Sequence, residues 1–70
     1  MKTFTAVLKK EEDMYIAECV ELGIASQGKN IEEALDNLKE ATELYLEEFP
    51  MKKTSKPLMT TFEVAEVAEA

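Results

Sequence analysis

The sequence predicts an α+β fold with the element order β-β-β-α-β, in which one helix packs on one face of a mainly antiparallel, four-stranded sheet. Two observations carry this prediction. Four short segments are rich in β-branched and aromatic residues and alternate with a period of two, which is typical of strands. Residues 31–48 instead place apolar side chains at helical spacing. With 70 residues, the chain is expected to form a single domain, residues 1–70, with a small core.

The predicted strands cover about residues 3–9, 14–20, 24–28 and 58–67. The polar stretch Lys10–Asp13 lies between the first two and predicts a hairpin with a loop of about four residues. Two successive hairpins make the first strand parallel to the third. A right-handed crossover through the helix then brings the last strand beside the first, which gives the sheet order 3-2-1-4.

The second strand is apolar on one face, with Tyr15, Ala17 and Cys19, and mostly apolar on the other, apart from Glu18. One helix covers only one face, so the other face is expected to contact a second copy of the chain in a dimer or tetramer. The residues assigned to this oligomer-facing side are Met14, Ile16 and Val20. The single cysteine, Cys19, lies in this apolar run and is expected to be a small buried hydrophobic side chain.

The helix at about residues 31–48 has clear end signals. Asn30 is a favourable N-cap, Glu33 completes a capping-box spacing, and Pro50 ends the helix. One stripe of the helix is predicted to face the core, with Leu44 pointing away from it; its members are Ile31, Ala34, Leu35, Leu38, Ala41, Thr42, Tyr45, Leu46 and Phe49. The opposite side is acidic and is expected to face solvent or a partner.

The stretch GIASQGKN, Gly23 to Asn30, is one residue short of a phosphate-binding loop, G-x-x-x-x-G-K-[ST]. Asn30 stands where the magnesium-binding Ser or Thr would be. Ordinary turn and cap chemistry explains the whole stretch: a turn at Gly23, a strand over residues 24–28 and a cap at Asn30. We therefore do not expect nucleotide binding.

Composition restricts the function classes. The net charge is −7, all eight basic residues are Lys, and there is neither Arg nor His. This balance argues against direct nucleic-acid binding and removes the commonest general base and metal ligand, so no cofactor or metal is expected. The charge suits a basic partner, but it also suits mere solubility. Without a signal-peptide h-region or a membrane-spanning apolar run, the protein is expected to be cytoplasmic, with no membrane partner.

Residues 15–48 closely resemble the amino-terminal domain of HicB-type antitoxins. The matching positions are Tyr15, Ala17, Glu21, Leu22, Ser26, Gly28, Glu32, Glu33, Ala34, Glu40, Ala41 and Glu47. Asn30 replaces the usual Ser or Thr cap, and the Pro and extra Gly that often flank the Glu-Leu turn are absent. The sequence ends before the position of the carboxy-terminal DNA-binding domain that many members carry. We therefore expect a stand-alone short member, which puts operator binding in doubt.

The resemblance implies a partial ribonuclease-H-like fold without a working nuclease centre, and it implies oligomerisation. It also implies a type II toxin–antitoxin system, in which the chain neutralises a small basic HicA-like toxin, an mRNA interferase, by direct binding rather than by catalysis. Our hypothesis for the toxin-facing surface is the acidic side of the helix, at Glu32, Asp36, Glu40 and Glu43. The same carboxylates could simply solvate the helix.

Two other functions stay open. The chain could be an orphan oligomeric binding or assembly module of the same fold with no toxin partner. Fold analogy alone also raises a metal-dependent nuclease that uses Asp13 and Glu18. The neighbouring acids of the hairpin loop are expected to splay into water, which makes catalysis the weaker alternative.

Overall fold

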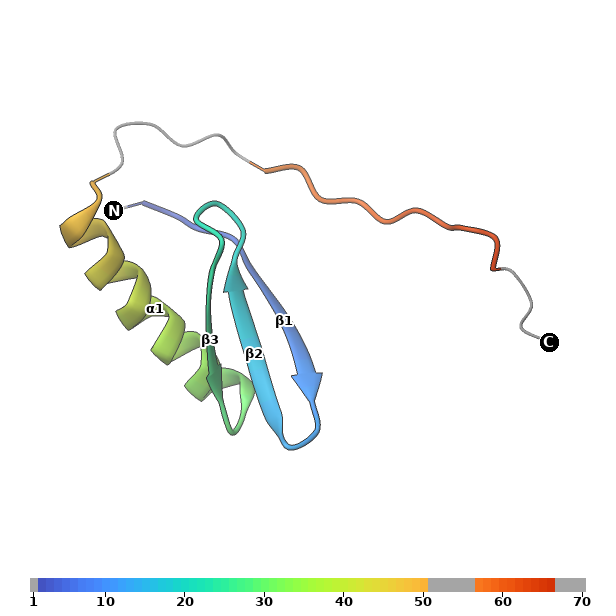
Figure 1. The fold of residues 1–70 in the computed structure, drawn as a ribbon, viewed down its shortest axis with the longest axis horizontal. Helices are drawn as coiled ribbons and strands as arrows, with labels where there is room; N and C mark the ends of the chain where they lie inside the picture. Colours follow the sequence, from blue (N-terminus) through green and yellow to red (C-terminus); the bar gives the residue numbers. More distant parts are fainter. Residues whose placement is uncertain (1, 51–56, 67–70) are drawn as a thin grey trace.

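A computed structural model describes residues 2–50 and 57–66 (Figure 1). Its elements follow the order β1 (Ala6–Glu11), β2 (Met14–Cys19), β3 (Ile24–Gly28) and α1 (Ile31–Glu48). The strands form one antiparallel sheet in the order β1-β2-β3. This confirms the α+β class, the helix and the first three strands.

The first hairpin is tighter than the sequence predicted. Strand β1 starts at Ala6 rather than near residue 3 and continues to Glu11, where it pairs with Met14. A two-residue turn, not a four-residue loop, therefore joins the strands, and Glu12 adopts a left-handed conformation with φ of 53° to close it. The charged end of β1 stays in the ladder partly because the Lys10 ammonium lies 5.7 Å from the centre of the Tyr15 ring on the facing strand.

The stretch between the two glycines is a strand, as the sequence predicted. Gly23 turns the chain with a φ of 71°, and its N–H donates a 2.8 Å hydrogen bond to the Cys19 carbonyl. Gly28 ends β3 where α1 begins. A Cβ atom placed on Gly28 would lie 2.5 Å from the backbone nitrogen of Ala34, so only glycine allows this close approach of helix and strand.

The ends of α1 follow the expected cap chemistry. The Asn30 side chain accepts a 2.8 Å hydrogen bond from the Glu33 N–H, and the Glu33 carboxylate accepts one from the Lys29 N–H at 2.8 Å. At the other end the Phe49 N–H donates to the Tyr45 carbonyl, and Pro50 follows. These bonds satisfy backbone groups that a helix end would otherwise leave unpaired.

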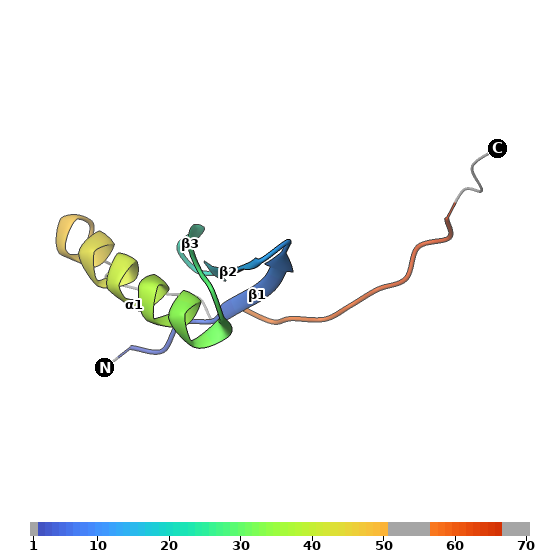
Figure 2. The same cartoon turned by 90° about the horizontal axis from the view of Figure 1, so that it is seen from below.

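The core lies between α1 and the β2–β3 side of the sheet (Figure 2). Ala17, Cys19, Ala34 and Leu38 are buried there, together with Thr42, which confirms the expected burial of Cys19. The predicted helix stripe was too wide, because α1 lies over β2 and β3 and leaves β1 uncovered. Three of its members are exposed, namely Ile31, Leu35 and Phe49. Leu44 is exposed, as predicted.

The predicted strand at 58–67 is not formed within the described residues. Residues 57–66 run as an extended segment away from the sheet (Figure 1), and position 67 lies outside the described residues. A strand exists only when its backbone groups pair with a neighbour, and here no neighbour lies alongside. The apolar side chains of the segment are consequently exposed: Leu58 at 98%, Phe62 at 85% and Val64 at 73%.

Candidate functional site

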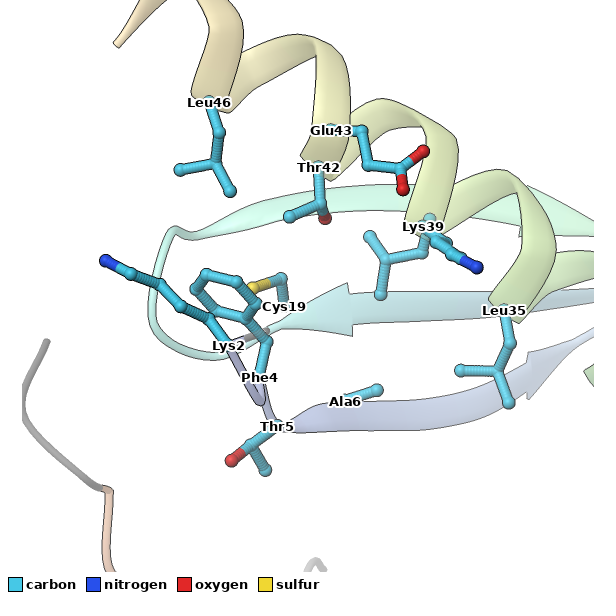
Figure 3. Close-up of a pocket in the computed structure, with 11 residues that line it drawn as sticks. Lys2, Phe4, Thr5, Ala6, Cys19, Leu35, Lys39, Thr42, Glu43 and Leu46 are labelled. Atoms are coloured by element: carbon cyan, nitrogen blue, oxygen red, sulfur yellow. The ribbon is translucent and has the colours of Figure 1, made fainter. Parts of the chain in front are cut away.

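An apolar groove lies between β1 and α1. Its volume is about 440 Å³, and Figure 3 shows its lining side chains, which come from residues 2–5, β1, β2 and α1; the Thr5 side chain points away from the helix. The lining residues are Lys2, Phe4, Thr5, Ala6, Cys19, Leu35, Leu38, Lys39, Thr42, Glu43 and Leu46. We call this set the β1–α1 groove. Its predominantly apolar lining suits an apolar side chain better than a charged metabolite.

The groove exists because the helix covers only part of the sheet. Ala6 and Leu8 pair with Cys19 and Ala17 and so face the helix side, but α1 contacts mainly β3 and β2. Within the described part of the chain β1 pairs only with β2, so its other edge exposes unpaired backbone N–H and C=O groups. An open strand edge beside an apolar groove is the geometry that accepts an added strand.

One carboxylate fixes the segment that precedes β1. The side chain of Glu21 accepts two hydrogen bonds from the Thr5 N–H, at 2.9 and 3.1 Å, and one from the Thr5 hydroxyl at 3.0 Å. These bonds lower the pKa of Glu21, with the backbone bond from Thr5 as the largest cause and partial desolvation opposing it. The Val20 N–H also donates to the Thr5 carbonyl at 2.9 Å, so the chain segment before β1 is held against the turn after β2.

The predicted toxin-facing carboxylates lie together on α1, as their spacing required. Glu32, Asp36, Glu40 and Glu43 are all exposed, and the helical repeat puts them within one side of the helix, opposite the buried Ala34–Leu38 stripe. Glu43 also lines the β1–α1 groove, as Figure 3 shows. The acidic side therefore borders the groove and forms one continuous surface with it. We call these four residues the acidic helix face.

The face of the sheet opposite α1 is also uncovered. Met14 and Ile16 lie on it, half-buried, and Val7 from β1 adds to it at 40% exposure. Val20 lies just beyond β2, in the turn, and is 39% exposed. The structure therefore leaves the predicted oligomer-facing residues accessible, and their contact with a second copy stays a prediction.

The structure does not bring the candidate nuclease residues together. Asp13 lies in the hairpin turn, and Glu18 lies five residues farther along β2, so their Cα atoms are separated by roughly 16 Å at the rise of a strand. Within residues 2–50 and 57–66, no three side chains of the types His, Cys, Asp and Glu gather as a metal site would require. In the same ranges no helix has the length and hydropathy needed to cross a membrane.

Sequence reasoning missed the β1–α1 groove, although one signal could have suggested it. The apolar stripe predicted for α1 is wider than the surface that one helix buries against a sheet of three short strands. Leu35 and Leu46 lie at the border of this stripe. Their distance in sequence from Phe4 and Ala6 hid the fact that all four line one hollow. The groove forms because α1 packs on β2 and β3 and leaves a gap beside β1.

Comparison with known proteins gives a family but no activity. A family model described as "Family of unknown function (DUF7387)" matches residues 4–66. A "UPF0150 protein" of Helicobacter pylori is 57% identical over 42 residues, which are 59% of this chain and 58% of that protein. The "UPF0150 protein ssr1258" of Synechocystis is 38% identical over 55 residues, which are 76% of this chain and 80% of that protein. No solved structure matches the chain significantly.

Proposed function

Because the chain belongs to the DUF7387 family of unknown function, whose description names no activity, we propose its function from the site: it is an antitoxin-like protein that binds a small basic toxin through the acidic helix face. The partner class is a HicA-like mRNA interferase of a type II toxin–antitoxin system. Inhibition is stoichiometric, and the chain itself is not an enzyme. The proposal places this action in the cytoplasm and requires no cofactor and no direct contact with nucleic acid.

The observation that carries this proposal is the acidic helix face on a well-capped helix. Four exposed carboxylates on one side of α1, in a chain of net charge −7, create a negative potential that attracts a cationic surface. An RNA-cleaving toxin must present such a surface to its polyanionic substrate. The acidic helix face therefore competes with RNA for the basic side chains of the toxin, and the rest of the domain blocks access to the active site of the toxin.

The proposal includes the remaining part of the predicted fold. Residues 58–66 complete the sheet as a fourth strand beside β1, in the order 3-2-1-4, which gives the partial ribonuclease-H-like topology. The support for this step is the open edge of β1, the apolar β1–α1 groove next to it, and the exposed apolar side chains of the segment.

The test is binding to the small basic protein that copurifies with the chain or is encoded beside it. Isothermal titration should give a stoichiometric complex whose affinity falls steeply with added salt, since exposed charges dominate the encounter. The double variant Asp36→Lys and Glu40→Lys should weaken binding at least about tenfold, the size of effect expected when several interface charges change sign. RNA cleavage by the toxin should return in proportion.

The matched control carries the same charge change on another side of the molecule. Glu12→Lys with Glu18→Lys alters the hairpin turn and the uncovered sheet face, both exposed and away from α1. This variant should bind within about threefold of the parent, because only long-range attraction changes. Equal weakening by both double variants would mean that net charge, and not the acidic helix face, attracts the toxin.

A second candidate function has support from a different surface. The uncovered sheet face with Met14, Ile16 and Val7 suits an orphan oligomeric assembly module without a toxin. In that case the purified chain should oligomerise and retain no small basic protein. The metal-dependent nuclease has no comparable support, given the separation of Asp13 from Glu18 along β2.

A further inference from the structure

Within residues 2–50 and 57–66, two complementary surfaces have no binding partner in the single chain. The first is the β1–α1 groove with the unpaired edge of β1 beside it. The second is the segment 57–66, which is already extended and lies away from the sheet (Figures 1 and 2). We call residues 57–66 the tail. Within the described residues, no backbone hydrogen bond joins the tail to the rest of the chain.

We propose that the tail of one copy docks on the β1 edge and in the β1–α1 groove of a second copy, and that the second copy returns its own tail, so that the protein is a tail-exchanged dimer. This inference rests on the proposed fourth strand and adds which chain supplies it. Both copies then bury the same set of surfaces, as the two-fold symmetry of most dimers requires.

The side-chain pattern of the tail fits the groove. Leu58, Phe62 and Val64 alternate at a period of two and therefore share one face of an extended strand, and their exposed fractions of 73–98% leave them in water until something covers them. The groove offers Phe4, Ala6, Leu35 and Leu46 as partners. Thr61 and Glu63 fall on the opposite face and would stay at the surface.

The charges of the two surfaces are also complementary. Lys9 of β1 already pairs with Glu11 at 3.1 Å, but Lys10 lies on the same face of β1 as Ala6. In the tail, Glu66 shares the face of the apolar side chains, so Lys10 and Glu66 can meet on docking. In a chain with a net charge of −7, Lys10 gives this edge a cation that attracts the acidic tail of a second copy. The apolar lining and Lys10 therefore fit the tail, whose apolar side chains and Glu66 share one face.

The small size of the core favours association with a second copy. Only Ala17, Cys19, Ala34 and Leu38 are buried hydrophobic residues among those described, and a chain of this length commonly associates to bury more. A folded body with an extended arm and an open edge is the arrangement from which arms are exchanged between identical protomers. Exchange fills both grooves and leaves neither β1 edge exposed to uncontrolled pairing.

The first experiment measures mass against concentration for the full chain. Sedimentation equilibrium should give twice the 7.9 kDa chain mass, with dissociation on dilution. Phe62→Glu should weaken the dimer about 100-fold or more, because a buried aromatic is lost twice in a symmetric pair. Thr61→Glu, the matched control on the other face of the tail, should change the dissociation constant less than about threefold.

The second experiment decides which chain receives the tail. Leu35→Glu damages the groove but keeps a helix-forming residue at an exposed position, so folding survives; Leu44→Glu is its matched control outside the groove. Phe62→Glu and Leu35→Glu should each be monomeric alone. Mixed, they should form a heterodimer, because the intact tail of one docks in the intact groove of the other. Native mass spectrometry would count its chains.

Three results would overturn the proposal. A parent that stays monomeric at all concentrations, with amide protons of the tail protected from exchange, would show that the tail docks on its own chain. A monomer with an unprotected tail would leave the groove to another occupant. A dimer unaffected by both Phe62→Glu and Leu35→Glu would assemble through the Met14–Ile16 face. None of these measurements uses a toxin. Failure of the proposed toxin binding would therefore be detected separately, by isothermal titration of the toxin with the acidic-helix-face variants.

Discussion

Replacing Gly28 with alanine tests the close approach of β3 to the first turn of α1. The added Cβ would meet the Ala34 nitrogen at 2.5 Å, the Glu33 carbonyl carbon at 2.8 Å and the Glu33 Cβ at 2.9 Å. None of these atoms is the end of a flexible side chain. Gly28 also pairs with Tyr15 in the ladder, so neither the strand nor the first turn of α1 can move without breaking other contacts.

The expected loss follows from these distances. Overpacking against rigid surroundings costs about 1–3 kcal/mol. Relief would shift the first turn of α1 by several tenths of an ångström and weaken the 2.8 Å bond from the Glu33 N–H to Asn30, a cap worth about 1 kcal/mol. Together Gly28→Ala should lower the free energy of unfolding by about 2–4 kcal/mol. That is a large share of the roughly 4–10 kcal/mol typical of a chain of this length.

The assay is urea unfolding followed by circular dichroism, with thermal unfolding alongside. At about 4–8 °C per kcal/mol for a domain of this size, the Tm should fall by roughly 8–32 °C. Gly23→Ala is the matched control. Nothing lies within 4 Å of a Cβ there, so its loss of about 1–2 kcal/mol comes only from the φ of 71°. A Gly28→Ala protein within about 0.5 kcal/mol of the parent would refute the close-packing argument.

Three further predictions concern the turn, the cap and the contact between Glu21 and Thr5. Glu12→Gly should raise the free energy of unfolding by about 0.5–1 kcal/mol, because glycine adopts the φ of 53° without steric cost; urea titration would show it, and a loss would refute the assigned turn. Asn30→Ala should cost about 1 kcal/mol while Asn30→Ser costs little, since only alanine removes the cap acceptor; equal losses would contradict the capping bond. The Glu21 pKa is lowered from 4.5 by its hydrogen bonds to Thr5, so its stabilisation is present above the unfolded pKa and is lost as pH falls through the folded one. Glu21→Gln should therefore destabilise at neutral pH, and the gap to the parent should close below pH 4.5; a gap independent of pH would point to lost packing instead.

Local chemistry explains why much of the fold could be predicted from sequence. The helix bounds, Ile31 to Glu48, follow from a side-chain cap at Asn30 and a proline at position 50, both of which act within one turn. Strand β3 was predicted from its two glycines and the alternation between them. The acidic helix face was likewise predictable, because residues at helical spacing share a side whatever the helix packs against.

The tertiary structure decided the features that depend on distance across the chain. The placement of α1 over β2 and β3 buried Leu38, left Leu35 exposed and opened the β1–α1 groove, and no local pattern encodes that offset. Pairing with Tyr15 and Met14 extends β1 to Glu11, although the sequence of these last residues of β1 predicts a loop. The tail depends on tertiary structure in the same way. Its alternation predicts a strand, but a strand forms only beside another strand edge, and the sequence pattern does not determine which chain provides that edge.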